Sequence, residues 1–189
     1  MSIIDAVKQA DTAAFKFINI NLHNELLSYL MRFTANDIFL IIVLAAGLFL
    51  LGRHFGKKER ADTAFALWSI IAANAVNNNL LKEFFKRQRP YMEVEGANLL
   101  VVMKKNGFAF PSTHTAMAAA LAAALWDNKA ARPYLAAFVL FVGFFCVYTG
   151  GHYPLDVLAG LFAGIVIGRI MNLLKKQYLK GLTTKESIK

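Results

Sequence analysis

The chain has 189 residues, of which 57% are hydrophobic and 17% are charged, and its formal net charge is +9. Soluble domains average about 45–50% apolar and about 25% charged residues, so this composition indicates a membrane protein with a single domain over residues 1–189. The basic residues separate apolar runs instead of lining one face, which favours loops at a lipid bilayer and argues against a nucleic-acid partner. The one cysteine, Cys146, excludes an intrachain disulfide and a cysteine-based zinc cluster.

The N-terminal segment is expected to form an amphipathic helix over residues 2–20. Its apolar residues recur at helical spacing: Ile3, Val7, Ala10, Ala14 and Phe17. Charged residues lie between them, so we expect this helix at the membrane interface or packed on a helix bundle. Because no basic leader precedes an apolar core, we expect no cleavable signal peptide. A second short helix is predicted over Glu25–Phe33.

Five apolar segments follow, and each reaches the spanning length of about 17–25 residues with modest extension or tilt. They are Ile38–Leu51, Asp62–Phe85, Ser112–Trp126, Pro133–Thr149 and Val157–Leu174. The N-terminal region would make a sixth span if it crosses the bilayer. The chain is therefore predicted to be all-α, an integral membrane helical bundle of five to six transmembrane helices. Its motif-bearing core covers residues 62–174, and a basic tail covers residues 175–189.

The loops between these segments predict an orientation in the membrane. Gly52–Arg60, Asp127–Pro133 and the tail from Lys175 are rich in Lys and Arg, and alternating spans place all three on one side. The positive-inside rule makes that side cytoplasmic, in a multi-pass protein of the inner membrane. Lys82–Pro111 and Thr149–Asp156 then face the extracytoplasmic side. The first of these is also basic, but cations that bind a substrate do not count as topology signals.

This topology brings chemistry-bearing residues from distant segments to one membrane boundary. One span ends in a basic stretch, the next begins after a proline, and the last begins after a short polar loop. The residues at that boundary are Lys82, Arg89, Ser112, His114, His152 and Asp156. Their convergence follows from the number of spans alone.

The basic and helix-initiating residues suit a doubly charged anion. Lys82 supplies a positive charge, and Arg89 supplies a bidentate donor for phosphate oxygens. Ser112 and Thr113 open a helix whose unpaired N–H groups also favour an anion. Each feature taken alone has an ordinary explanation, because cations at a helix end anchor to lipid headgroups and a Pro-Ser-Thr sequence begins many helices. Their occurrence on one side of the membrane favours a phosphate site.

The two histidines suit covalent phosphoryl transfer. His152 lies four residues before Asp156, close enough for the carboxylate to hold one ring nitrogen and leave the other as a nucleophile. His114 remains as the acid that protonates a departing oxygen. A metal bound by these residues is the alternative, but the neighbouring cations would repel it. We therefore expect neither a metal nor another cofactor.

Three motifs carry a resemblance to a known family. Lys82 is followed after six residues by Arg89 and a proline, Pro111–His114 reads Pro-Ser-Thr-His, and His152 precedes Asp156 by four. The chain resembles the membrane-bound type 2 phosphatidic acid phosphatase (lipid phosphate phosphatase) superfamily, in particular its short bacterial members. The family's motifs are K-x6-RP, PSGH and SR-x5-H-x3-D.

The resemblance implies a six-helix membrane fold and a role for each matching residue. His152 would be the nucleophile that forms a phosphohistidine, Asp156 would orient it, and His114 would act first as general acid and then as base. The cations of the first motif and the start of the second would hold the phosphoryl oxygens: Lys82, Arg89, Ser112 and Thr113. Thr113 stands in the place of the family's glycine, where the backbone N–H is retained.

One departure from the pattern concerns the third motif. Counting back from His152, the family's Ser-Arg pair falls on Phe145 and Cys146, so the arginine is absent. Cys146 itself is best explained as a small residue at a helix contact. Four cations are candidates to replace the missing arginine: Lys86, Arg87, Lys104 and Lys105.

These observations predict a lipid phosphatase that acts on a phosphomonoester or diphosphate of a membrane lipid at the outer membrane face. Undecaprenyl diphosphate is the first expected substrate, and phosphatidylglycerophosphate, phosphatidic acid and lipid A phosphates are alternatives. A non-catalytic phospholipid-binding protein, inactivated by the loss of the arginine, is the alternative from another class. The small residues Gly160, Gly164 and Gly168 are expected to pack within a monomer rather than to form a dimer.

Overall fold

The computed structural model describes residues 2–34, 56–101 and 107–186, and all regular secondary structure in those ranges is helical. The prediction of an all-α protein is confirmed to that extent. The predicted span Ile38–Leu51 lies outside the described residues. The elements are α1 (Ile3–Lys16), η1 (Phe17–Asn21), α2 (Glu25–Thr34), α4 (Lys57–Val76), η2 (Asn77–Leu81), α5 (Lys82–Phe85), α6 (Pro90–Glu93), α7 (Thr113–Ala124), α8 (Arg132–Tyr148) and α9 (Pro154–Glu186).

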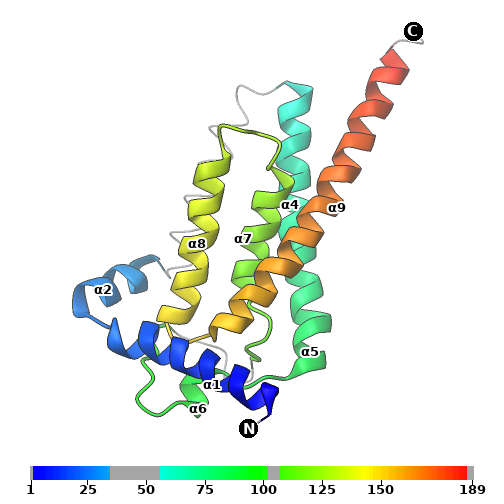
Figure 1. Cartoon of the computed structure of the whole chain (residues 1–189). Helices are drawn as coiled ribbons and strands as arrows, with labels where there is room; N and C mark the ends of the chain where they lie inside the picture. Colours follow the sequence, from blue (N-terminus) through cyan, green and yellow to red (C-terminus); the bar gives the residue numbers. More distant parts are fainter. Residues whose placement is uncertain (1, 35–55, 102–106, 187–189) are drawn as a thin grey trace.

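Four helices, α4, α7, α8 and α9, run alongside one another as the main body of the protein (Figure 1). The central helix is α7, which contacts the other three. Nine of its twelve residues are buried, and seven of those nine are alanines. Small side chains let neighbouring helices approach closely, so the alanine-rich sequence of α7 suits its central position. The α4 helix continues without a break through η2 and α5.

The closest helix contact joins α9 to α7 through three glycines. A Cβ atom on Gly160 would lie 2.4 Å from the Ser112 carbonyl oxygen, and one on Gly164 would lie 2.2 Å from that of Ala116. Gly168 meets the carbonyl of Ala120 in the same way, at 2.3 Å. The predicted small-residue ridge therefore packs within the chain.

The outer surface of the bundle carries large apolar side chains. Trp68 on α4, Leu140 on α8 and Phe162 on α9 are 60%, 74% and 73% exposed. Water-soluble proteins rarely expose such side chains together, whereas a lipid bilayer accommodates them.

By length and composition, one helix in the described part of the chain could cross a membrane, and it covers Pro154–Leu182 of α9. The α8 helix is apolar but shorter. The number of five to six spans therefore stays a prediction. The basic tail was expected to begin at Lys175, but α9 continues through this residue. Lys175 is buried and pairs with Asp62 of α4 at 2.5 Å.

The N-terminal helix lies across one end of the bundle, close to the start of α9 (Figure 1). The predicted helix is confirmed, and the face that packs on the bundle is formed by Asp11 and Phe15 of α1 with Asn19 of η1. The Asn19 amide donates to the carbonyl of Tyr148 at 2.7 Å and thereby ties η1 to the end of α8. The apolar stripe noted in the sequence points away from the bundle, with the exposed residues Ile3, Val7 and Phe17.

The glycine contact predicts a large stability difference between two substitutions on one helix. Gly164→Ala should destabilise the fold by about 1–3 kcal/mol, because the new methyl group meets backbone and cannot be accommodated without moving a helix. Gly181→Ala is the matched control on α9, since no atom lies within 4 Å of its Cβ position. Thermal unfolding in detergent micelles measures both. Equal melting temperatures for the two variants would contradict the packing described here.

Candidate active site

Most of the predicted site residues meet at the end of the bundle where α1 lies. The end of α5, the start of α7, the end of α8 and the start of α9 all reach this end (Figure 1). Six of the predicted residues are buried there: Lys82, Arg89, Ser112, Thr113, His152 and Asp156. His114, in the first turn of α7, is exposed. The convergence expected from the topology is thus present in the structure, whereas the chemical role of each residue stays a prediction.

The ring of His152 is held by a main-chain carbonyl. Its Nδ1 atom lies 2.7 Å from the carbonyl oxygen of Ala109 and 3.8 Å from Asp156 Oδ2. A carbonyl can only accept, so Nδ1 carries the proton and Nε2 is left unprotonated, with the lone pair that a nucleophile needs. The hydrogen bond expected from Asp156 is made by Ala109 instead, and the carboxylate acts on the ring through its charge at the longer distance.

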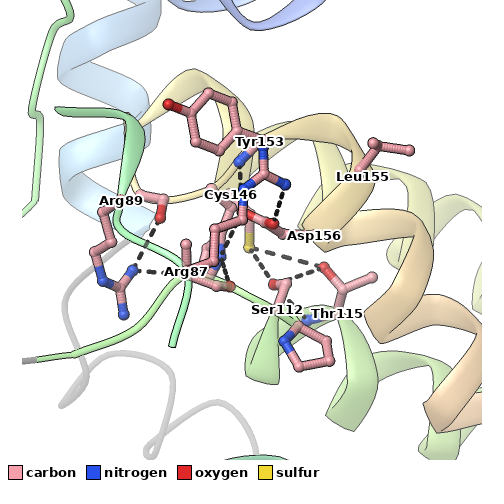
Figure 2. Close-up of polar contacts among 12 residues, drawn as sticks. Arg87, Arg89, Ser112, Thr115, Cys146, Tyr153, Leu155 and Asp156 are labelled. Atoms are coloured by element: carbon pink, nitrogen blue, oxygen red, sulfur yellow. Dashed lines mark hydrogen bonds and ion pairs between the residues drawn. The ribbon is translucent and has the colours of Figure 1, made fainter. Parts of the chain in front are cut away.

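Asp156 is fully buried and both of its carboxylate oxygens are occupied. Oδ1 accepts from Arg87 Nη1 at 2.7 Å, and Oδ2 accepts from the backbone N–H of Tyr153 at 2.8 Å. Figure 2 shows Arg87 and Asp156 facing each other at the start of α9. These contacts fix the carboxylate beside the His152 ring.

Arg89 places a positive charge next to the free ring nitrogen of His152. Its Nε donates to the carbonyl of Gly107 at 2.8 Å, and its Nη1 donates to the carbonyl of Gly151 at 3.0 Å. Nη1 also lies 3.4 Å from His152 Nε2. The two carbonyls therefore hold the guanidinium where a phosphoryl group attached to Nε2 would need a cation.

Lys82 adds a second cation to this end of the bundle. Its side chain is only 9% exposed, and it lies close enough to Arg89, Asp156 and Cys146 to interact electrostatically with each. Among the residues that the structure describes, its amino group has no hydrogen bond or ion pair. The Lys82 amino nitrogen is not among the fully buried unpaired polar atoms of the described residues, so it remains accessible to a phosphate oxygen. Lys82 and Arg89 thus form a cationic site that can bind phosphate.

Ser112 begins α7 as its N-cap. Its hydroxyl oxygen accepts from the Thr115 N–H at 3.4 Å and from the Thr115 hydroxyl at 3.1 Å. The Ser112 hydroxyl in turn donates to the Cys146 sulfur at 3.5 Å (Figure 2). Cys146 is 1% exposed. The position of the family's arginine is therefore filled by a buried thiol that contacts the start of α7.

Thr113 is anchored by asparagines of η2. Its hydroxyl accepts from Asn77 Nδ2 at 3.0 Å and donates to Asn78 Oδ1 at 2.9 Å. Asn77 Nδ2 also donates to the carbonyl of Pro111 at 3.0 Å. A glycine at position 113 could make none of the hydroxyl contacts, so the threonine ties the start of α7 to the helix that carries Lys82.

The four candidate replacements for the missing arginine differ in their positions. Arg87 is in the site, but both of its terminal nitrogens contact carboxylates, Nη1 on Asp156 and Nη2 on Asp11. Lys86 follows α5 in a left-handed backbone conformation and is exposed. Lys104 and Lys105 lie outside the described residues. That one of these cations replaces the arginine missing at position 146 stays a prediction.

Several residues that build the site were missed in the sequence. Asp11 is the one with a readable signal, because it lies four residues before Phe15 and thus on the same helix face, where a buried carboxylate needs a partner. The other missed groups are the main-chain carbonyls of Gly107, Ala109 and Gly151. A carbonyl is present at every residue, so no side-chain pattern could have marked these three.

The surroundings of His152 favour its neutral form. Burial lowers the pKa of its imidazole from 6.5 to about 4, and the positive charge of Arg89 acts in the same direction against the opposing effect of Asp156. His152 should therefore stay uncharged and nucleophilic down to a pH well below neutral.

Magnetic resonance of the histidine nitrogens tests this state directly. In protein labelled with a heavy nitrogen isotope in histidine, His152 should show the neutral Nδ1–H form throughout the range from about pH 8 to about pH 5, where an ordinary histidine becomes charged. A His152→Gln variant assigns the signal. A His152 signal that titrates near pH 6.5 would contradict the buried geometry.

Taken together, the described residues form a helical protein with an apolar outer surface, a buried neutral histidine and a cationic site at one end. That is the equipment of a phosphoryl-transfer enzyme that works at a membrane. Residues 62–179 match the PAP2 superfamily, which is more than half of the chain, so the protein belongs to this family. It is accordingly a hydrolase of phosphoester bonds.

Three proteins to which the chain is similar are phosphatases that differ in the lipid phosphate named for each. The chain is 30% identical over 156 residues to the undecaprenyl-diphosphatase BcrC of Bacillus subtilis, which covers 82% of this chain and 78% of that protein. It is 28% identical over 171 residues to a lipid A 4'-phosphatase of Bacteroides thetaiotaomicron, covering 86% and 75% of the two chains. A transmembrane PAP2-type phosphatidylglycerolphosphate phosphatase of Bacillus subtilis has a similar fold, with a TM-score of 0.65 at 23% identity over 93% of this chain and 87% of that one.

Proposed function

We propose that this protein is an integral membrane lipid phosphatase whose preferred substrate is undecaprenyl diphosphate. The observation that carries the proposal is the pair of buried cations, Lys82 and Arg89, of which Arg89 lies 3.4 Å from the nucleophilic nitrogen of His152. The 30% identity to an undecaprenyl-diphosphatase favours the diphosphate among the lipid substrates. Phosphatidylglycerophosphate, phosphatidic acid and lipid A phosphates are the alternative substrates.

The reaction follows from the positions of these groups. The terminal phosphoryl group binds between Lys82, Arg89 and the start of α7 at Ser112 and Thr113. His152 Nε2 attacks the phosphorus, the bond from phosphorus to the leaving oxygen breaks, and that oxygen takes a proton from His114. The product is a phosphohistidine and a lipid that is shorter by one phosphate.

Water completes the cycle. His114, now the base, removes a proton from a water molecule, whose oxygen attacks the phosphohistidine. The nitrogen–phosphorus bond breaks, inorganic phosphate leaves, and His152 returns to its neutral form with the proton on Nδ1. Asp156 stabilises the ring while it carries positive charge, since its carboxylate oxygen lies 3.8 Å from Nδ1.

The same proposal places the protein in the cytoplasmic membrane with five to six spans and the site on the extracytoplasmic side. The exposed apolar surface of α8 and α9 supports lipid contact along the bundle, with Leu140 and Phe162 pointing outward. A lipid tail would then stay in the bilayer while its phosphate reaches the site at the bundle end. We expect a monomer and no cofactor.

Phosphate release from a panel of lipid phosphates tests the proposed function. Purified protein should release phosphate fastest from undecaprenyl diphosphate, and His152→Ala should lower the rate at least about 10³-fold because the nucleophile is lost. His23→Ala is the matched histidine control and should retain activity. Assays with and without chelator test metal independence. A folded protein that binds these lipids but releases no phosphate from any of them would instead support the non-catalytic phospholipid-binding alternative.

The thiol at the third motif gives a separate prediction. Cys146→Arg should raise kcat/KM, because it adds a cation near the bound phosphate. In other phosphoryl-transfer enzymes such a cation raises kcat by about 10³-fold or more. It should also lower the melting temperature of the phosphate-free protein, since Cys146 lies near Lys82 and Arg89. Cys146→Ala controls for the loss of the thiol. Unchanged kcat/KM in Cys146→Arg would indicate that another cation already serves this purpose.

A further inference from the structure

The N-terminal helix contributes a buried carboxylate to the end of the bundle. Asp11 is 4% exposed, and both of its oxygens contact residues that surround the site. Oδ2 accepts from Arg87 Nη2 at 2.6 Å, and Oδ1 accepts from the backbone N–H of Leu155 at 2.9 Å. Leu155 is the second residue of α9, so Asp11 also caps the helix that carries Asp156.

Arg87 is held on three sides. Asp11 binds Nη2, Asp156 binds Nη1 at 2.7 Å, and the ring of Tyr153 lies 4.0 Å from the guanidinium carbon. Figure 2 shows Arg87 between the start of α9 and the Tyr153 ring. Two charged hydrogen bonds would have to break before these nitrogens could bind a phosphate, and such bonds are about twice as strong as neutral ones. The contacts suit a residue that holds other groups in place.

The main chain of Arg87 supports the nucleophile as well. Its carbonyl accepts from the Ala109 N–H at 2.8 Å, and the Ala109 carbonyl accepts from His152 Nδ1 at 2.7 Å. One residue therefore fixes both partners of the imidazole. Its backbone orders the carbonyl that sets the ring tautomer, and its side chain orders the carboxylate that faces the ring.

We infer that Arg87 and Asp11 are positioning residues for the phosphoryl transfer, with Arg87 aiming Asp156 at the His152 ring and Asp11 holding Arg87 in that position. The inference rests on the proposed function. Positive charge develops on the ring when Nε2 takes the phosphoryl group, so a fixed carboxylate stabilises the transition state more than the free enzyme. Without Asp11, Arg87 can turn toward solvent or phosphate, and Asp156 loses a charged partner.

This role extends the active site beyond the family region. The PAP2 match covers residues 62–179, and Asp11 lies before it. The N-terminal helix is thus part of the catalytic machinery through one side chain, whereas its exposed apolar stripe faces the opposite way.

Substitutions that remove charge but keep shape separate positioning from packing. Asp11→Asn retains an oxygen that can accept from Leu155 N–H, so the α9 cap survives while the ion pair with Arg87 is lost. Arg87→Gln removes the guanidinium and keeps the main-chain contact to Ala109. Each variant should lower kcat on undecaprenyl diphosphate by about 10- to 100-fold and change KM by less than about 3-fold. A loss of this size is usual for a residue that orients a reacting group without contacting the substrate.

The double variant tests whether Asp11 acts through Arg87. If Asp11 works through Arg87, the variant with both changes should have the kcat of Arg87→Gln alone, because effects within one chain of contacts are not additive. Arg87→Lys should recover part of the lost kcat, since it restores a positive charge to Asp156 without the bidentate geometry. Asp5→Asn on the same helix and Gln88→Ala beside Arg87 are exposed controls that should keep wild-type kinetics.

Three results would overturn the inference. A raised KM with unchanged kcat in Arg87→Gln would make Arg87 a phosphate ligand. Multiplied losses in the double variant would show that Asp11 acts independently, through the α9 cap or through folding. Wild-type kinetics in both single variants would remove any role in the reaction. A wild-type protein without phosphatase activity is a different failure, because it overturns the proposed function itself and is seen before any variant is made.

Discussion

The close contact between α7 and α9 is the constraint on which the site depends. Gly160 brings α9 so near to α7 that a Cβ would lie 2.4 Å from the Ser112 carbonyl, and the Ser112 N–H donates to the Asp156 carbonyl at 2.9 Å. These contacts join the second motif to the third through backbone alone. Because both helices begin at this point, their first turns and the loop that carries His152 meet there.

Charge balance is the second requirement of this end of the bundle. Three cations, Lys82, Arg87 and Arg89, lie near two buried carboxylates, Asp11 and Asp156. Arg87 is neutralised by the carboxylates, and Arg89 is held by neutral carbonyls. The excess positive charge is thus concentrated at Lys82 and Arg89, and Arg89 lies next to His152. In a partly buried site such charges interact more strongly than in water, which favours a doubly charged phosphate as their counterion.

The sequence predicted the helices and the convergence of the motifs because both depend on local patterns. Apolar segments of near-spanning length located α4, α7, α8 and α9, and the motif spacing located Lys82, His152 and the residues around them. The contacts of these residues could not be predicted in the same way. Asp156 lies beside His152 as expected, at 3.8 Å, but it also binds Arg87, and the ring donates its hydrogen bond to a carbonyl that no pattern marks. For α1, the apolar stripe left open whether the helix lies at the membrane interface or packs on the bundle, and the face that packs inward carries Asp11 and Phe15 instead of that stripe.

The carbonyl of Ala109 has a further consequence for how this enzyme tolerates change. The group that sets the tautomer of His152 belongs to the peptide backbone, so no replacement of the Ala109 side chain can delete it. Because the residue is fully buried, a replacement of its side chain changes the packing volume and leaves the carbonyl group in place. A mutational scan that seeks functional positions by the chemistry of their side chains would therefore pass over residue 109, although the orientation of the His152 ring depends on it.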